Sequence, residues 1–96
     1  MDRVLVLAAI LVLAGRMALS ADAPPGASAC SGCHPAASGV DTPVKRLKGQ
    51  DAAQIVAAVQ EFRSGKRAAT VMDRIAKGFT DDEIRAIAAW YAAQKD

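Results

Sequence analysis

The stretch CSGCHP, residues 30–35, holds both cysteines of this chain and its only histidine. Cys30 and Cys33 are three positions apart, so on one turn of helix their sulfurs leave from the same side. His34 follows Cys30 by four positions, and its ring leaves from nearly the same face. Two thiols and one imidazole are therefore expected to converge on one side of a single turn.

This spacing predicts the C-x-x-C-H attachment site of a c-type haem. The two thiols can add across the two vinyl groups of the macrocycle, and the imidazole then lies below its centre, where iron sits. The sequence thus predicts one covalently bound haem c. Cys30 and Cys33 are the expected thioether links, and His34 is the expected proximal ligand of the iron.

Three other chemistries use closely spaced cysteines. A thioredoxin-like dithiol belongs in a βαβ setting, and no strand pattern occurs in this sequence. A structural zinc ion needs four ligands, whereas the chain offers three suitable ones together. A disulfide between Cys30 and Cys33 is possible in an exported protein, but it closes a small loop and stabilises little. The residue pattern favours haem over these alternatives.

Residues 1–20 are typical of a secretory signal peptide. A charged start is followed by an apolar run from Val4 to Ala14 and then by small residues. The run is shorter than the roughly 20 apolar residues of a membrane-spanning helix, and Arg16 interrupts it, which disfavours the alternative of a retained anchor. We expect cleavage after Ser20 or Ala21, a periplasmic product, and no membrane span in that product.

The remaining residues, 21–96, are expected to form one small haem domain. Of the chain's 12 Lys and Arg, two precede Ala21, and of its 10 Asp and Glu, one does, so the domain is nearly neutral. That balance gives no sign of nucleic-acid binding. A domain this short buries a small core, and we expect a prosthetic group to help stabilise it.

Two helices are marked by their capping residues. Asp51 with Gln54, and Gly65 at the far end, predict a helix over about 51–64. Thr80 with Glu83 forms a second capping box and predicts a helix that runs to the chain's end. Phe79 before this box and Ile84 after it occupy the two positions of a hydrophobic staple, in which apolar side chains on either side of a helix start pack together.

The rest of the domain carries weaker signals. The segment DRIAK before Gly78 can form a single turn, whereas 21–29 and 35–50, rich in small residues and turn formers, are expected to be irregular. No stretch alternates with a period of two residues. The fold class predicted from the sequence is therefore all-α.

The other face of the iron needs a ligand or stays open. Met72 is the one methionine after the signal peptide, and a lysine could bind iron only if deprotonated. Met72 is therefore the expected distal ligand, with a core-filling methionine as the alternative. A closed His/Met site is typical of an electron carrier, whereas an open site would indicate a haem enzyme or gas binder. Pro43 can place its carbonyl against the second nitrogen of His34, or it is an ordinary loop proline.

The C-terminal part of the domain resembles a known family. Residues 61–94, EFRSGKRAATVMDRIAKGFTDDEIRAIAAWYAAQ, resemble the cytochrome subunit of flavocytochrome c sulfide dehydrogenase, a class I cytochrome c. The matching positions are Phe62, Gly65, Ala69, Thr70, Met72, Arg74 to Gly78, and Phe79. The chain departs from the family pattern in its short leading segment and in Pro35 after His34.

The resemblance implies a class I cytochrome c fold, with helices and loops wrapped around one haem. It implies Cys30 and Cys33 as haem links and His34 and Met72 as iron ligands. It also implies a non-catalytic, periplasmic electron-transfer subunit that takes electrons from a flavoprotein (FAD) subunit oxidising sulfide and passes them to a downstream acceptor.

Three rival functions remain. The chain could be a free-standing monohaem cytochrome that shuttles electrons to an oxidase or to another dehydrogenase. It could be a haem enzyme or gas-binding protein whose iron has an open face. It could also be an adaptor without a cofactor, held by a disulfide. Co-purification with a flavoprotein would indicate the subunit over the free carrier. Binding of external ligands to the iron would indicate an open face, and a colourless protein would indicate the adaptor.

Overall fold

A computed structural model describes residues 22–95 of the chain. The predicted signal peptide, residues 1–20, lies outside the described residues, as do the two end residues, 21 and 96, of the predicted haem domain.

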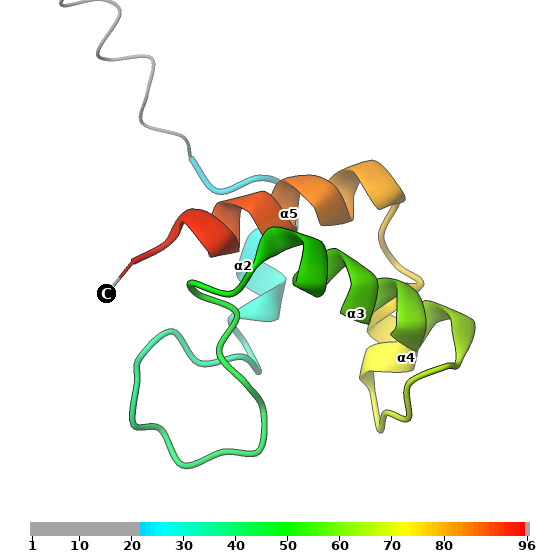
Figure 1. Ribbon diagram of the computed structural model, residues 1–96, viewed down its shortest axis with the longest axis horizontal. Helices are drawn as coiled ribbons and strands as arrows, with labels where there is room; N and C mark the ends of the chain where they lie inside the picture. The colour runs from blue at the N-terminus through cyan, green and yellow to red at the C-terminus, as the bar shows by residue number, and fades with distance from the viewer. Residues whose placement is uncertain (1–21, 96) are drawn as a thin grey trace, which may run out of the picture.

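Within 22–95 the chain forms four helices and no strand (Figure 1). They are α2 (Ala27–Cys30), α3 (Ala52–Ser64), α4 (Met72–Ala76) and α5 (Asp81–Ala93). Helix α3 packs against both α4 and α5, and the loop 35–50 extends to one side of α3 (Figure 1). No helix in this part of the chain is long and apolar enough to cross a membrane. The all-α prediction is confirmed for the described residues.

Helix α3 begins and ends where its capping residues predict. The Asp51 carboxylate accepts the Gln54 N–H at 3.1 Å, which satisfies one of the unpaired donors of the first turn. Gly65 adopts φ +80° after the last turn and donates its N–H to the Phe62 carbonyl. A glycine there avoids the steric cost that a side chain meets in the left-handed region. The predicted helix over 51–64 is confirmed.

Helix α5 begins with the complete capping box that the sequence predicts. The Thr80 hydroxyl accepts the Glu83 N–H at 3.1 Å, and the Glu83 carboxylate accepts the Thr80 N–H at 2.9 Å. This second bond holds the pKa of Glu83 below its ordinary value. The helix ends at Ala93, and Gln94 is extended. The prediction that the helix runs to the chain's end is therefore wrong by the last few residues.

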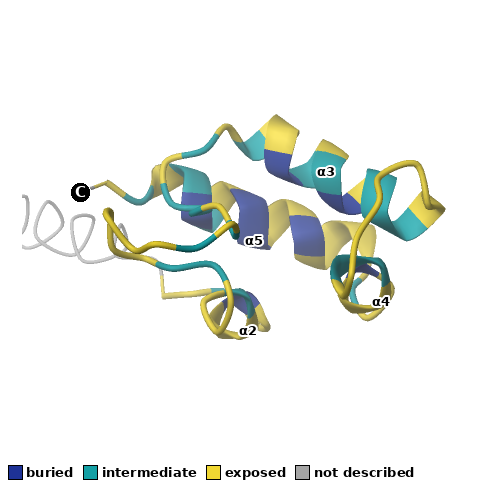
Figure 2. Cartoon of the chain, turned by 90° about the horizontal axis from the view of Figure 1, so that it is seen from below, coloured by how far each residue is buried: buried dark blue, intermediate teal, exposed yellow. Residues whose placement is uncertain are grey.

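The core of the described residues is thin and lies between α5 and its neighbours (Figure 2). One cluster consists of Ala27, Ile55, Ile87, Ala88 and Tyr91, and the other consists of Val59, Ala76 and Ile84. The side chains with at most 1% exposure are alanines, and no large side chain is buried to that degree. The packing among these residues alone therefore removes little apolar surface from water.

Segment 22–29 is more ordered than its composition predicts, because α2 begins within it. Gly26 adopts φ +85° just before this helix, and a Cβ atom there would lie 2.7 Å from the Phe79 ring. Ala27 is fully buried, and the Tyr91 hydroxyl donates a hydrogen bond to its carbonyl. These contacts with residues far along the chain stabilise a turn that local sequence does not indicate.

The first prediction concerns the cap of α5. Replacing Thr80 with Ala removes the side-chain acceptor of the Glu83 N–H, and we expect the free energy of unfolding to fall by about 1 kcal/mol. Urea denaturation followed by far-ultraviolet circular dichroism measures this change. Ser38→Ala, which removes an exposed loop hydroxyl, is the control and should leave the midpoint unchanged. Equal midpoints for the two variants would contradict the role of the cap.

Candidate haem-binding site

The C-x-x-C-H motif lies on a continuation of α2. Helix α2 ends at Cys30, and the carbonyl of Cys30 accepts the N–H of Cys33 at 3.2 Å and the N–H of His34 at 2.9 Å. These bonds prolong the helical path by one turn, so the structure brings Cys30, Cys33 and His34 together on a single turn. This is the arrangement that the sequence spacing predicts.

Both thiols are free in the structure, with Cys30 half-buried and Cys33 exposed. Burial raises the pKa of the Cys30 thiol above its ordinary value, so this thiol is protonated at neutral pH. A redox dithiol instead depends on a lowered thiol pKa. The two thiols and the imidazole also do not form a group that could hold a metal ion by themselves. The raised pKa of the Cys30 thiol therefore disfavours the dithiol alternative.

The ring of His34 is oriented by a backbone carbonyl. Its Nδ1 lies 2.5 Å from the carbonyl oxygen of Lys45. An Nδ1–H that donates to this oxygen leaves the lone pair of Nε2 available for a metal. The carbonyl comes from Lys45 and not from Pro43, so the suggested role of Pro43 is wrong. Every residue offers a carbonyl, and the sequence carries no signal that selects the one at Lys45.

Two contacts hold the loop that supplies this carbonyl. The Arg46 guanidinium donates twice to the Ala36 carbonyl, at 2.9 and 2.6 Å, which closes the loop across its base. The Gly49 N–H donates to the Tyr91 carbonyl at 3.0 Å and ties the end of the loop to α5. The Lys45 carbonyl therefore lies on a braced segment next to His34.

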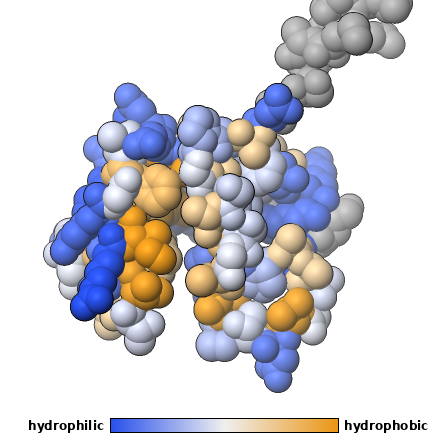
Figure 3. All heavy atoms as spheres, turned by 180° about the vertical axis from the view of Figure 1, so that it is seen from behind, coloured by the Kyte–Doolittle hydropathy of each residue, from blue (hydrophilic) through white to orange (hydrophobic). Residues whose placement is uncertain are grey.

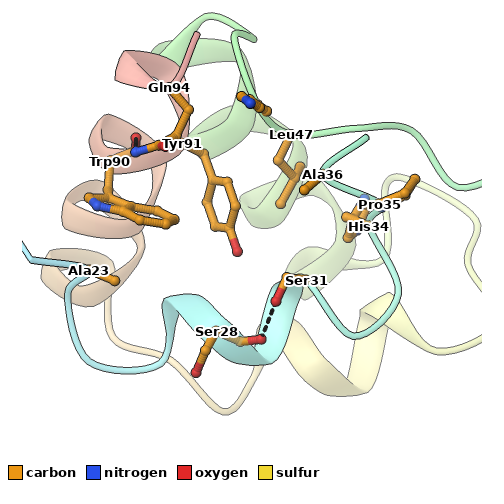
Figure 4. A pocket seen from close by; sticks show the side chains of 11 residues that line it. Ala23, Ser28, Ser31, His34, Pro35, Ala36, Leu47, Trp90, Tyr91 and Gln94 are labelled. Atoms are coloured by element: carbon orange, nitrogen blue, oxygen red, sulfur yellow. Dashed lines mark hydrogen bonds between the residues drawn. The ribbon is translucent and has the colours of Figure 1, made fainter. Parts of the chain in front are cut away.

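A cavity of about 210 Å³ lies on the α5 side of His34 (Figure 4). The rings of Trp90 and Tyr91 form one wall, edge to face with centroids 4.9 Å apart, and Leu47 lines the loop side. Ligand pockets usually measure ~300–1,000 Å³. This cavity is smaller than that range, and the ring of His34 lies at its edge.

A hollow separates the lobe of α4 from the lobe of the loop 35–50 (Figure 3), and hydrophobic side chains gather on both lobes beside it. Three large apolar residues in the described chain remain exposed: Val40 at 52% belongs to the loop lobe, and Val71 at 47% and Ile75 at 39% belong to the α4 lobe. Exposed apolar surface on two facing lobes favours a shared apolar partner. The exposed apolar side chains of the two lobes match the chemistry of an apolar prosthetic group such as haem.

Met72 lies on a separate element from the motif. It is the first residue of α4 and is half-buried. The loop that holds the His34 ring belongs to one lobe of Figure 3, and α4 belongs to the other. The structure thus groups three of the predicted site residues on one turn and places the fourth, Met72, on the far lobe.

Two known proteins are similar in sequence to this chain. No protein-family profile matches the chain. The "cytochrome subunit of sulfide dehydrogenase" of Chlorobaculum tepidum is 36% identical over 62 residues, which cover 65% of this chain and 56% of that protein. The "thiosulfate dehydrogenase electron acceptor" of Thiomonas intermedia is 39% identical over 83 residues, which cover 82% of this chain and 38% of that protein.

The chain spans about half the length of the first of these relatives and less of the second. The similarity to the first agrees with the resemblance found in residues 61–94, and the fold is helical throughout the described residues. The resemblance is confirmed to this extent: the chain is similar to the cytochrome subunit of sulfide dehydrogenase.

Proposed function

We propose that this chain is an exported electron-transfer cytochrome that carries one covalent haem and accepts electrons from a dehydrogenase of reduced sulfur compounds. The observation that carries the proposal is the turn at residues 30–34. It presents two thiols and an imidazole whose Nδ1 is fixed by the Lys45 carbonyl. The names of both relatives support the same class of function.

Four side chains would hold the cofactor. Cys30 and Cys33 would form its thioether links, the Nε2 atom of His34 would bind the iron on one face, and the Met72 sulfur would bind it on the other. Haem bound in this way supplies reversible one-electron transfer, and a thioether ligand raises its reduction potential.

The chain's own residues then tune that centre. The Lys45 carbonyl accepts the Nδ1 proton of His34, which fixes the tautomer and makes Nε2 a stronger donor to the metal. Val71 and Ile75, exposed apolar residues at α4, would help to shield a haem bound beside that helix from water. An iron closed on both faces has no position for a substrate, and this property fits a carrier.

The oxidation of the sulfur compound belongs to the partner in this proposal. Beyond the motif the chain has no further cysteine or histidine to act as a nucleophile or base. We propose a flavoprotein (FAD) subunit that oxidises sulfide as the electron donor, and a separate downstream acceptor. Residues 1–20 would direct the chain to the periplasm, where residues 21–96 would form the haem domain.

A second candidate function is a free-standing carrier that takes electrons from another dehydrogenase. The Thiomonas relative favours it, because that protein is named as the electron acceptor of a thiosulfate dehydrogenase. The two candidates share the haem site and differ in whether the dehydrogenase remains bound.

The ligand role of Met72 gives a direct prediction. Met72→Ala should keep the covalent haem, lose the far-red absorption of thioether-bound ferric iron, and lower the reduction potential by an amount on the order of tenths of a volt. It should also open the ferrous iron to carbon monoxide. Ile75→Ala, on the same helix but without a ligating atom, is the matched control. A Met72→Ala protein with the spectrum and potential of the Ile75→Ala protein would discard the assignment and favour an open iron face.

The identity of the electron donor is tested by purification from the periplasm. A tagged chain should bring down a flavin-containing protein in a fixed ratio to haem, as visible spectra report both pigments. The complex should become reduced when sulfide is added, whereas the cytochrome alone should be reduced far more slowly. A haem protein without flavin, reduced only when a separate thiosulfate dehydrogenase and thiosulfate are supplied, would favour the free carrier.

A further inference from the structure

Arg63 stands apart from the other arginines because its guanidinium leaves α3 and binds the junction between α4 and α5. Its Nε donates to the Ala76 carbonyl at 3.2 Å, and its Nη2 donates to the Phe79 carbonyl at 2.8 Å. Its Nη1 donates to the Asp81 carboxylate at 2.5 Å. One planar fork thus connects three acceptors that lie 13 to 18 positions further along the chain.

These acceptors fix the two ends of the short connection between the helices. Ala76 is the last residue of α4, so its carbonyl is one of the groups that the helix itself leaves unpaired. Phe79 precedes the cap of α5, and Asp81 is the first residue of that helix. Arg63 therefore sets the position of α4 relative to both α3 and α5.

Besides the Arg63 contacts, helix α4 is held by its packing against α3. It is a single turn of five residues, and a helix this short is not stable by itself. Ala76, 1% exposed, is its one buried residue and packs in the cluster with Val59 and Ile84. Ile75 on the same turn is exposed. The C-terminal end of α4 is held, and Met72 at the other end depends on that attachment.

We propose that Arg63 is a positioning residue for Met72: by binding the Ala76 and Phe79 carbonyls, it keeps α4 in the place from which the Met72 sulfur can bind iron. This inference rests on the proposed function, in which Met72 is the distal ligand. Loss of the Arg63 contacts should release α4 and let the sulfur leave the iron more often, while the thioether links and His34 remain in place.

Another arginine provides a control for charge. Arg85 pairs with Asp82 at 2.6 Å within α5, where its side chain is 59% exposed, whereas the Arg63 side chain is 29% exposed. An exposed pair of this kind contributes little to stability. Arg85→Gln removes the same charge as Arg63→Gln without touching α4.

The test compares haem-loaded Arg63→Gln, Arg63→Lys, Arg85→Gln and Thr80→Ala with the unchanged protein. We expect Arg63→Gln to weaken the far-red thioether band of the ferric protein and to raise the rate of carbon monoxide binding to the ferrous protein about tenfold or more, because hydrogen bonds from a charged group are lost. Arg63→Lys keeps the charge but not the fork, so its rate should lie between those of Arg63→Gln and Arg85→Gln.

Thr80→Ala controls for a general loss of stability, since it weakens the start of α5 by removing a side chain that Arg63 does not bind. It should bind carbon monoxide at the rate of the unchanged protein. If Arg63→Gln binds carbon monoxide at the same rate as Arg85→Gln, or at the same rate as Thr80→Ala, the proposed role of Arg63 is overturned. The ligand role of Met72 is not affected by that result. If the unchanged protein lacks the thioether band and binds carbon monoxide freely, the ligand role of Met72 is wrong, and the inference about Arg63 is overturned with it.

Discussion

The carbonyl of Cys30, which accepts the N–H groups of both Cys33 and His34, is the constraint on which the site depends. These two bonds place the thiols and the imidazole on one turn, and a break in that turn would separate them. The turn is itself fixed from outside, because Tyr91 on α5 donates its hydroxyl to the Ala27 carbonyl in α2. The far end of the chain thus supports the residues proposed to bind the cofactor.

The thin core explains why a prosthetic group matters to the whole domain. The most buried side chains are alanines, and large apolar residues stay exposed on the two lobes that border the hollow (Figure 3). A haem in that hollow would cover surface from both lobes and would connect the loop 35–50 to α4, two segments near opposite ends of α3 (Figure 1). In the proposed protein the cofactor is therefore part of the core as well as the redox centre.

The sequence predicts the helix ends that are fixed by contacts between residues close together in the chain. The starts of α3 and α5 follow from Asp51 and Thr80, whose side chains bind N–H groups three residues away. Helix α2 was not predicted, because its stability comes from Phe79, Ile87 and Tyr91 far along the chain. The partner of His34 and the acceptors of Arg63 were also beyond sequence reasoning, since they are backbone carbonyls whose positions depend on the path of the folded chain.

The most direct measurement is the fate of the pigment when the protein, exported in cells with a working cytochrome-maturation apparatus, is denatured in acidified organic solvent. Thioether bonds at Cys30 and Cys33 predict a coloured protein whose haem stays with the polypeptide, in a ratio of about one per chain. A colourless product, or a pigment that is fully extracted from the chain, would contradict the account.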